Sequence, residues 1–157
     1  MGTIEVELAL SATAEVRQLI EELDHELGQL YTLEQCHGLR LDAIFQPDIR
    51  FFVARHSEAA IGCGGIALGT EFAEVKRMYV RREWRGRGVA DAILDLLITE
   101  AAGSGLKLVR LETGARSAAA IHFYRRSGFQ PCGPFGSFTC LPRTSVVTSI
   151  FMERQLT

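Results

Sequence analysis

The chain has 157 residues, of which 47% are hydrophobic and 23% charged, and its formal net charge is −2. This size and composition predict one domain over residues 1–157, and the near-neutral charge argues against general attraction to nucleic acid or anionic lipid. The N-terminus lacks a basic region followed by a long apolar run, and no window approaches the roughly 18 uninterrupted apolar residues of a membrane span. We therefore expect a soluble cytoplasmic protein that is not bound to a membrane.

The first third of the chain predicts a strand and two helices. Residues 4–8 alternate apolar side chains with glutamate, which predicts a half-exposed strand. Ser11 or Thr13 can cap a helix whose apolar positions keep helical spacing as far as Leu30. A shorter helix is expected over Leu39–Phe45, ending before the next proline.

A hairpin and a further strand follow. Residues 50–56 (RFFVARH) and 60–68 (AIGCGGIAL) are predicted to pair across a tight turn. The three glycines of the second segment weaken strand propensity but permit a close approach of another backbone. Residues 72–80 (FAEVKRMYV) are predicted as the next strand.

The second half alternates helices and strands. Gly128 is placed to end a helix in the left-handed conformation. The predicted elements are a helix over Gly88–Ala102, a strand over Leu106–Glu112, a helix over Ala118–Arg126, and strands over Phe129–Cys132 and Val146–Arg154. The order of elements predicts a mixed α/β sheet with at least one parallel crossover.

Cysteine and histidine spacing gives no sign of a metal site. The cysteines show no CxxC pair, and the histidines are not spaced with cysteine or carboxylate in a ligand pattern. We therefore expect free thiols and no bound metal. The residues concerned are Cys36, Cys63, Cys132, Cys140, His25, His37, His56 and His122.

The segment between the strand over residues 72–80 and the next helix is rich in arginine and glycine. A helix N-terminus has unpaired N–H groups and a partial positive charge, which suit an anion. Gly86 and Gly88 remove the side chains that would keep a phosphate away, and Arg85 and Arg87 add positive charge. A solvated basic turn is the alternative, but the strand-to-helix context favours a phosphate site.

Two familiar phosphate motifs do not account for this loop. A nucleoside triphosphate loop requires Gly-Lys-Ser/Thr, whereas Gly88 is followed by Val89 and Ala90. The dinucleotide pattern G-x-G-x-x-G begins at Gly86 but meets Asp91 in place of its third glycine.

The stretch RGRGVA, residues 85–90, resembles the R/Q-x-x-G-x-G/A signature of the GNAT superfamily of acyl-CoA-dependent N-acetyltransferases. FAEVKRMYV before it and AAIHFYRRSGF, residues 119–129, resemble the neighbouring family segments in the same order. The resemblance implies a mixed, mostly antiparallel sheet of about six to seven strands with helices on both faces. The chain is most similar to small single-domain bacterial members.

The resemblance also implies acetyl-CoA as co-substrate. The loop would hold the coenzyme pyrophosphate, and the preceding strand would contact the pantetheine arm. Ser117 stands where the family often has asparagine, so one coenzyme hydrogen bond differs. The residues expected to bind coenzyme are Met78, Tyr79, Val80, Arg85, Gly86, Arg87, Gly88, Val89, Ala90, Ser117 and Tyr124.

Acetyl transfer to an amine requires a base, and two glutamates are candidates. By resemblance, Glu74 matches a general base of some family members, and a solvent-facing strand residue is the alternative. Glu112 ends the following strand, and the carboxyl ends of strands in α/β sheets collect at the ligand crevice. A water molecule can relay the proton in either case.

Tyr124 occupies the position of the family's usual general acid toward the coenzyme sulfur, and core packing beside Phe123 is the alternative. A phenol of pKa ~10 would give its proton to a thiolate of ~8.5 uphill by about 2 kcal/mol in water. We therefore expect Tyr124 to act partly by hydrogen bonding to the sulfur as charge develops.

The acceptor site is expected between the first two helices and in the late GPFGSFTCLPRT loop. Tyr31, His37 and Arg40 are the candidate substrate-binding residues. Arg40 or Arg143 could pair with a substrate carboxylate, which would favour an amino acid or a related acid.

The main functional prediction is direct acetyl transfer from acetyl-CoA to a primary amine of a small molecule. A non-catalytic acyl-CoA-binding or sensing module and a dinucleotide-binding protein are the alternatives. The apolar run VVTSIF, residues 146–151, together with the family resemblance, is consistent with a homodimer.

Overall fold

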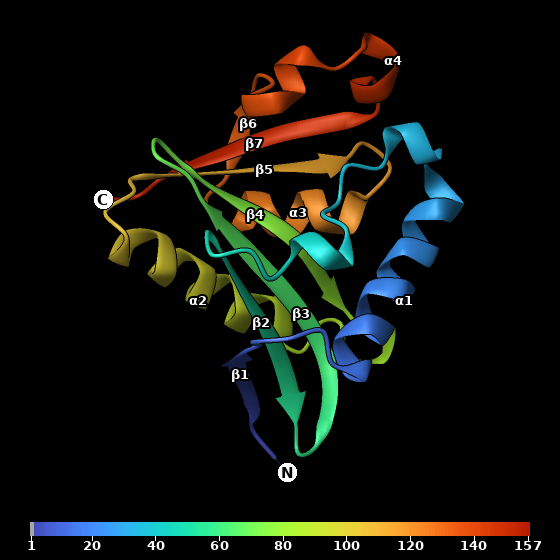
Figure 1. The fold of residues 1–157 in the computed structure, drawn as a ribbon, viewed down its shortest axis with the longest axis vertical. Helices are drawn as coiled ribbons and strands as arrows, with labels where there is room; N and C mark the ends of the chain where they lie inside the picture. The colour runs from blue at the N-terminus through green and yellow to red at the C-terminus, as the bar shows by residue number, and fades with distance from the viewer. Residues whose placement is uncertain (1) are drawn as a thin grey trace.

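A seven-stranded sheet forms the centre of the molecule (Figure 1), and the computed structural model describes residues 2–157. The strand order is β1-β2-β3-β4-β5-β7-β6, and only β4 and β5 are parallel neighbours within the described residues. The mixed, mostly antiparallel sheet is therefore confirmed. The strands are β1 (Ile4–Leu8), β2 (Ile49–His56), β3 (Ala59–Leu68), β4 (Ala73–Val80), β5 (Leu108–Gly114), β6 (Gln130–Cys132) and β7 (Ser149–Gln155).

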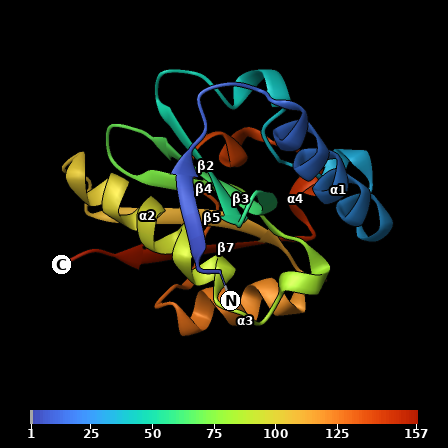
Figure 2. The same ribbon diagram turned by 90° about the horizontal axis from the view of Figure 1, so that it is seen from below.

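Helices cover both faces of this sheet, as predicted. Figure 2 shows α1 on one side and α2 and α3 on the other. Successive side chains of β2 point to opposite faces, so Phe51 and Val53 pack under α1 while Phe52 and Ala54 pack under α2. The helices are α1 (Ala14–Leu30), α2 (Val89–Gly103), α3 (Ala118–Arg126) and the short α4 (Arg143–Val146).

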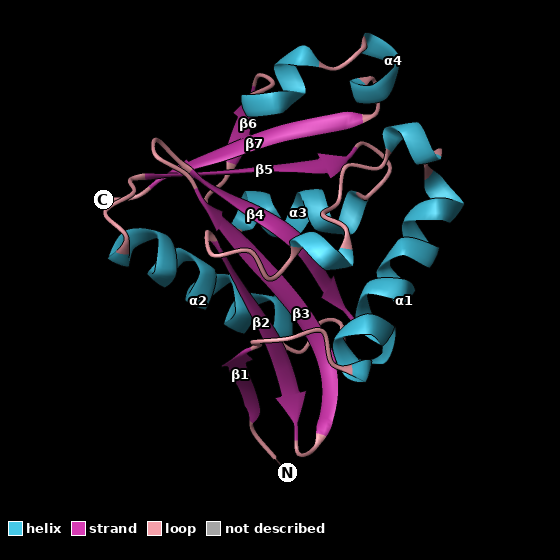
Figure 3. Ribbon diagram, viewed as in Figure 1, coloured by secondary structure: helices cyan, strands magenta, loops and turns pink. Residues whose placement is uncertain are grey.

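The parallel pair β4–β5 is connected through α2 (Figure 3), which is the predicted crossover. The two strands pair only at Ala73 with Val109 and at Glu74 with Arg110. β4 then bends at Arg77, which has a left-handed φ of 56° at an irregularity in the pairing with β3. The two strands consequently separate toward their carboxyl ends.

Two helix ends lie at the capping residues that the sequence predicted. Thr13, rather than Ser11, caps α1, and its hydroxyl accepts the Val16 N–H at 3.3 Å. Gly128 follows α3 with a φ of 93°, where the Phe129 N–H donates to the Tyr124 carbonyl.

Two predicted elements were wrong in extent. The helix expected over Leu39–Phe45 is a single 3₁₀ turn, Leu41–Ala43, because so short a segment gains too few hydrogen bonds to offset the cost of helix nucleation. The strand expected from Val146 begins at Ser149, because Val146 is instead the last residue of the short helix α4, for which Pro142 is the N-cap residue. Further 3₁₀ turns span Leu33–Gln35, Arg82–Trp84 and Gly136–Cys140.

Some properties of the whole described range bear on function. None of its helices has both the length and the apolar character needed to cross a membrane. The four cysteines all carry free thiols. No group of three histidine, cysteine or acidic side chains within residues 2–157 is arranged to hold a metal ion.

Gly62 permits the close approach predicted for the glycine-rich strand β3. A Cβ atom at this position would lie 2.8 Å from the Tyr79 carbonyl oxygen of β4 and 3.3 Å from Val89 Cγ1. Gly28 on α1 contrasts with it, because nothing lies within 4 Å of its Cβ position.

We expect Gly62→Ala to lower the free energy of unfolding by roughly 1–3 kcal/mol, because the added methyl overpacks the β3–β4 contact. Gly28→Ala is the matched control and should raise it by about 0.5–1 kcal/mol through helix propensity. Urea unfolding of both variants measures the difference. Equal stability of Gly62→Ala and the wild type would contradict this packing argument.

Candidate active site

A cavity of about 800 Å³ opens where β4 and β5 separate. The walls come from α1, β4, the end of β5, α3 and the arginine–glycine loop, Arg81–Gly88. This is the predicted place for a ligand, because strand ends and a helix N-terminus meet there.

The arginine–glycine loop presents bare backbone to this cavity. Gly86 and Gly88 have φ values of 76° and 83°, and nothing lies within 4 Å of a Cβ built on either residue. Gly88 caps α2 without a side-chain hydrogen bond, so the first N–H groups of the helix remain available. The geometry suits an anion, and the cavity lining continues through Val89 and Ala90 to Asp91.

The loop arginines are largely engaged with protein groups. Arg85 forms an ion pair with Glu26 of α1 at 2.9 Å, and both residues line the cavity. Arg87 lies over the Trp84 ring, with its guanidinium carbon 5.0 Å from the ring centre, and is outside the cavity lining. The positive charge near the loop is thus partly neutralised by α1.

The end of β4 lines the cavity over Met78, Tyr79 and Val80, the residues that were predicted to contact the pantetheine arm. β4 has no pairing with β5 beyond Glu74 in the described structure. Backbone groups on this side of β4 are therefore free to bind an extended amide chain, as in β-strand addition.

Tyr124 belongs both to the core and to the cavity wall. Its ring packs between Phe123 and Phe129, with centroid distances of 5.1 and 5.7 Å, and the residue is only 6% exposed. It also lines the cavity. Burial raises the pKa of Tyr124 well above its ordinary value, so its phenol stays protonated.

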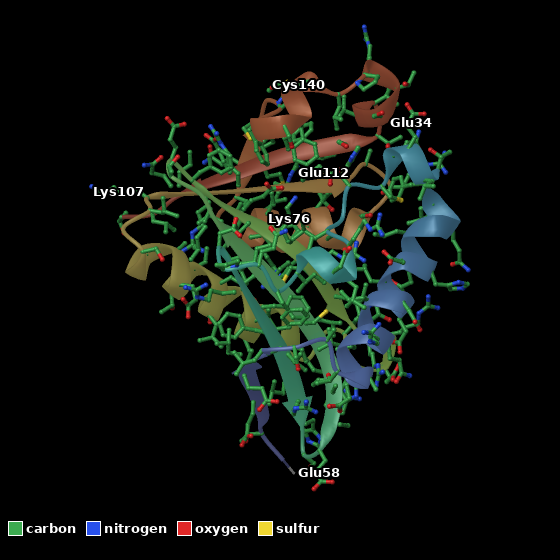
Figure 4. The ribbon with its side chains drawn as sticks, in the orientation of Figure 1. Glu34, Glu58, Lys76, Lys107, Glu112 and Cys140 are labelled. Carbon is green, nitrogen blue, oxygen red and sulfur yellow. The ribbon has the colours of Figure 1, made fainter. Side chains whose placement is uncertain are left out.

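Both candidate bases line the cavity, but their surroundings differ. Glu74 forms an ion pair with Lys76 at 2.6 Å, and each side chain is 16% exposed. Glu112 accepts a hydrogen bond of 2.7 Å from the Ser149 hydroxyl. Burial raises the pKa of Glu112, while that hydrogen bond and nearby His37 and Lys76 oppose the rise. Figure 4 shows Lys76 on β4 and Glu112 on β5.

The acceptor candidates separate into two groups. Tyr31 and His37 line the cavity, whereas Arg40 lies outside its lining with a side chain 87% exposed and 3.7 Å from Asp42. The Tyr31 hydroxyl lies 2.9 Å from the Ser117 hydroxyl, so the two side chains are hydrogen bonded. Arg143 is likewise exposed and outside the cavity lining.

His37 ties the segment after α1 to the segment before β7. Its Nε2 donates to the Ser145 carbonyl at 2.6 Å, and Glu34 accepts hydrogen bonds from the Thr144 and Ser145 hydroxyls. Two segments about 110 residues apart in sequence are thereby held together beside the cavity.

Sequence reasoning missed several lining residues. Lys76 had a usable signal, because it follows Glu74 by two positions on the same face of β4. Arg116 and Cys36 had none, since they lie in loops whose course depends on tertiary packing. Glu26 also had no distinguishing signal, because within its helix it looks like an ordinary surface charge.

Known proteins with similar sequences include acetyltransferases. The sequence profile of the acetyltransferase (GNAT) family matches residues 13–129. An "IAA acetyltransferase" of Azospirillum brasilense is 46% identical over 143 residues, 90% of each chain. An uncharacterized N-acetyltransferase of Bacillus subtilis, YsnE, is 31% identical over 145 residues, 90% of this chain and 93% of the relative.

A solved structure is also similar over nearly the whole chain. A Klebsiella pneumoniae protein proposed to be an acyl-CoA N-acyltransferase superposes with a TM-score of 0.79 and 29% identity, over 99% of each chain. The dinucleotide-binding and non-catalytic alternatives are therefore wrong. The chain belongs to the acetyltransferase (GNAT) family and is an acetyl-CoA-dependent N-acetyltransferase.

Proposed function

We propose that the enzyme transfers the acetyl group directly from acetyl-CoA to a primary amine of a small molecule while both are bound. The observation that carries this proposal is one cavity shared by the arginine–glycine loop, Tyr124 and the carboxylates Glu74 and Glu112. Both substrates can lie along that cavity, and positioning alone supplies much of the rate gain. No cysteine is needed as a nucleophile.

The coenzyme binds along the loop and β4 in this proposal. The N–H groups of residues 86–90 hold the pyrophosphate, and the backbone of Met78–Val80 holds the pantetheine arm. Ser117 lies at the start of α3 with its hydroxyl bonded to Tyr31, so it contacts the arm beside the acceptor. These backbone contacts require the separation of β4 from β5.

The acceptor must be neutral to attack the thioester. An alkyl amine of pKa ~10.4 is neutral about one part in a thousand near pH 7.4, a cost of roughly 4 kcal/mol. An α-amine of pKa near ~8 costs less than ~1 kcal/mol. A base is therefore most important for lysine-like amines.

Glu112 suits the role of general base better than Glu74. The Glu74 carboxylate is already engaged by the Lys76 ammonium at 2.6 Å, so it is less available to an attacking amine. Burial raises the pKa of Glu112, which brings it nearer to the pKa of the amine whose proton it must accept, directly or through water.

Tyr124 assists the departing sulfur. Because burial raises the pKa of its phenol, complete proton transfer to the thiolate is unfavourable. A hydrogen bond to the sulfur is strongest when charge develops, so it lowers the barrier without tightening the binding of acetyl-CoA.

The acceptor is a small molecule that reaches Tyr31 and His37. Leu23, Leu27 and Leu30 form an apolar wall of the same cavity, which favours an amine with an apolar part. Arg116 also lines the cavity, and within residues 2–157 it has no ion-pair partner, so it replaces Arg40 as the candidate for a substrate carboxylate.

Release of free thiol from acetyl-CoA, followed with amino acids, aromatic amines, polyamines, aminoglycosides, peptides and IAA (indole-3-acetic acid), tests the proposal. We expect release that depends on a primary amine, with acetylated amine seen by mass spectrometry. The relative named for IAA makes that acid a required member of the panel. Because it has no primary amine, turnover of IAA alone would contradict the amine proposal.

For Tyr124→Phe we expect kcat to fall roughly tenfold to a hundredfold, the size of a hydrogen bond made to a charged atom in the transition state. The Kd for acetyl-CoA should stay unchanged, because the ground-state sulfur carries no charge. Steady-state kinetics and calorimetry measure the two quantities. An unchanged kcat would remove Tyr124 from the mechanism.

Glu112→Gln should lower kcat/KM about a hundredfold, the usual contribution of a general base. Activity rises as pH rises through the pKa of this carboxyl, which burial raises, so the acidic limb lies above the ordinary glutamate value of ~4.3. Ser149→Ala removes the hydrogen bond that stabilises the carboxylate and should move the limb to higher pH.

Glu74→Gln is the matched comparison for the base. It removes a carboxylate from the same cavity but leaves Glu112 in place. We expect a smaller loss of kcat/KM than in Glu112→Gln. The opposite order of the two variants would assign the base to Glu74.

A further inference from the structure

Ion pairs connect one face of α1 to β4 and the arginine–glycine loop. The Arg85–Glu26 pair differs from the others, because both of its members line the cavity. Its side chains are 44% and 27% exposed, so solvent and ligands can reach them. The pairs are Arg77–Asp24, Arg81–Glu22, Arg85–Glu26 and a longer one, Arg82–Glu26 at 3.5 Å.

Arg85 makes three kinds of contact at once. Its Nη2 donates to both carboxylate oxygens of Glu26 at 2.9 Å. Its Nε donates to the Val80 carbonyl at 2.8 Å, and its guanidinium carbon lies 5.7 Å from the centre of the Tyr79 ring. The face of the guanidinium that carries Nε and Nη2, which could otherwise bind two phosphate oxygens side by side, is already in use for Val80 and Glu26.

These contacts fix the entry to the phosphate site. Val80 is the last residue of β4 and Arg85 directly precedes Gly86, so the Nε–carbonyl bond closes the intervening 3₁₀ turn, Arg82–Trp84, into a fixed loop. The direction of the following N–H groups depends on that closure. Glu26 adds a second anchor, on the helix that also carries the apolar wall of the cavity.

We propose that Glu26 is a positioning residue that holds Arg85 as a structural contact of the loop, and that Arg85 does not bind the pyrophosphate through its side chain. This inference rests on the proposed role of the loop in binding coenzyme. The pyrophosphate then depends on backbone N–H groups whose geometry the Glu26–Arg85 pair maintains. The pair also links the coenzyme site to the α1 wall of the acceptor cavity.

The opposite assignment makes Arg85 a direct ligand of the pyrophosphate. Glu26 would then compete with the phosphate for the same guanidinium. Its removal would free Arg85 and tighten coenzyme binding. The two assignments therefore predict opposite signs for one substitution, Glu26→Gln.

The experiment measures the Kd of CoA by calorimetry for the wild type, Glu26→Gln, Arg85→Gln and the double variant. We expect each single variant to bind CoA about fivefold more weakly, the scale of one partly exposed ion pair. The double variant should lose less affinity than the sum of the two single losses, because both single variants remove the Glu26–Arg85 contact. Inhibition by pantetheine, which lacks the pyrophosphate, should be unchanged in all three.

Arg85→Lys sharpens the distinction. Lysine keeps the charge that a phosphate ligand needs, but its single nitrogen cannot reproduce the separate contacts that Nη2 makes with Glu26 and Nε makes with Val80. We expect it to bind CoA as weakly as Arg85→Gln does. Wild-type affinity in Arg85→Lys, or tighter or unchanged binding in Glu26→Gln, would overturn the proposal.

Glu15→Gln is the matched control. Glu15 also ties α1 to the sheet, through Arg55 at 2.7 Å, but neither residue lines the cavity. We expect CoA affinity to be unchanged in this variant. A fivefold loss would contradict the proposal, because it would mean that weakening any contact between α1 and the sheet lowers CoA affinity. Thermal melting of every variant verifies folding.

A wild type that fails to bind CoA would count against the proposed role of the loop, whereas tight binding by Glu26→Gln counts only against the positioning role.

Discussion

The separation of β4 from β5 is the constraint on which the site depends. The strands share two residue pairs and then diverge, because the bulge at Arg77 turns β4 away. Backbone groups that a continuous sheet would pair internally are left facing a cavity, and they need partners there. An amide-containing arm can supply those partners. The same divergence places the end of β5, with Glu112, opposite the end of β4.

The parts of this site that follow from local sequence could be predicted. Gly86 and Gly88 adopt left-handed conformations at a strand-to-helix junction, and such glycines leave a signal in a few residues of sequence. The same holds for Gly128 after α3 and for the bounds of α3 itself, which match the prediction. The helix expected near Leu41 was wrong because amphipathic spacing over so few residues does not decide between a helix and a 3₁₀ turn.

Contacts between distant residues could not be predicted. Ser149 meets Glu112 because β5 and β7 pair in a particular register, and one residue of slip would place the hydroxyl on the other face. Glu26 and Arg85 are 59 residues apart, and each alone looks like an ordinary surface charge. Arg40 was chosen for its charge and its neighbours, but the segment turns its side chain to solvent.

Glu112 differs from the other carboxylates of the cavity because it is not part of an ion pair within residues 2–157. Around the cavity, Glu26, Glu74 and Asp91 each lie against a basic side chain. Each of these three carboxylates is thus already engaged by a cation. Glu112 has a hydroxyl as its hydrogen-bond partner and no ion pair within residues 2–157, so burial dominates its protonation. In the proposed mechanism, Glu112 is therefore the cavity carboxylate that is left to accept the proton of an attacking amine.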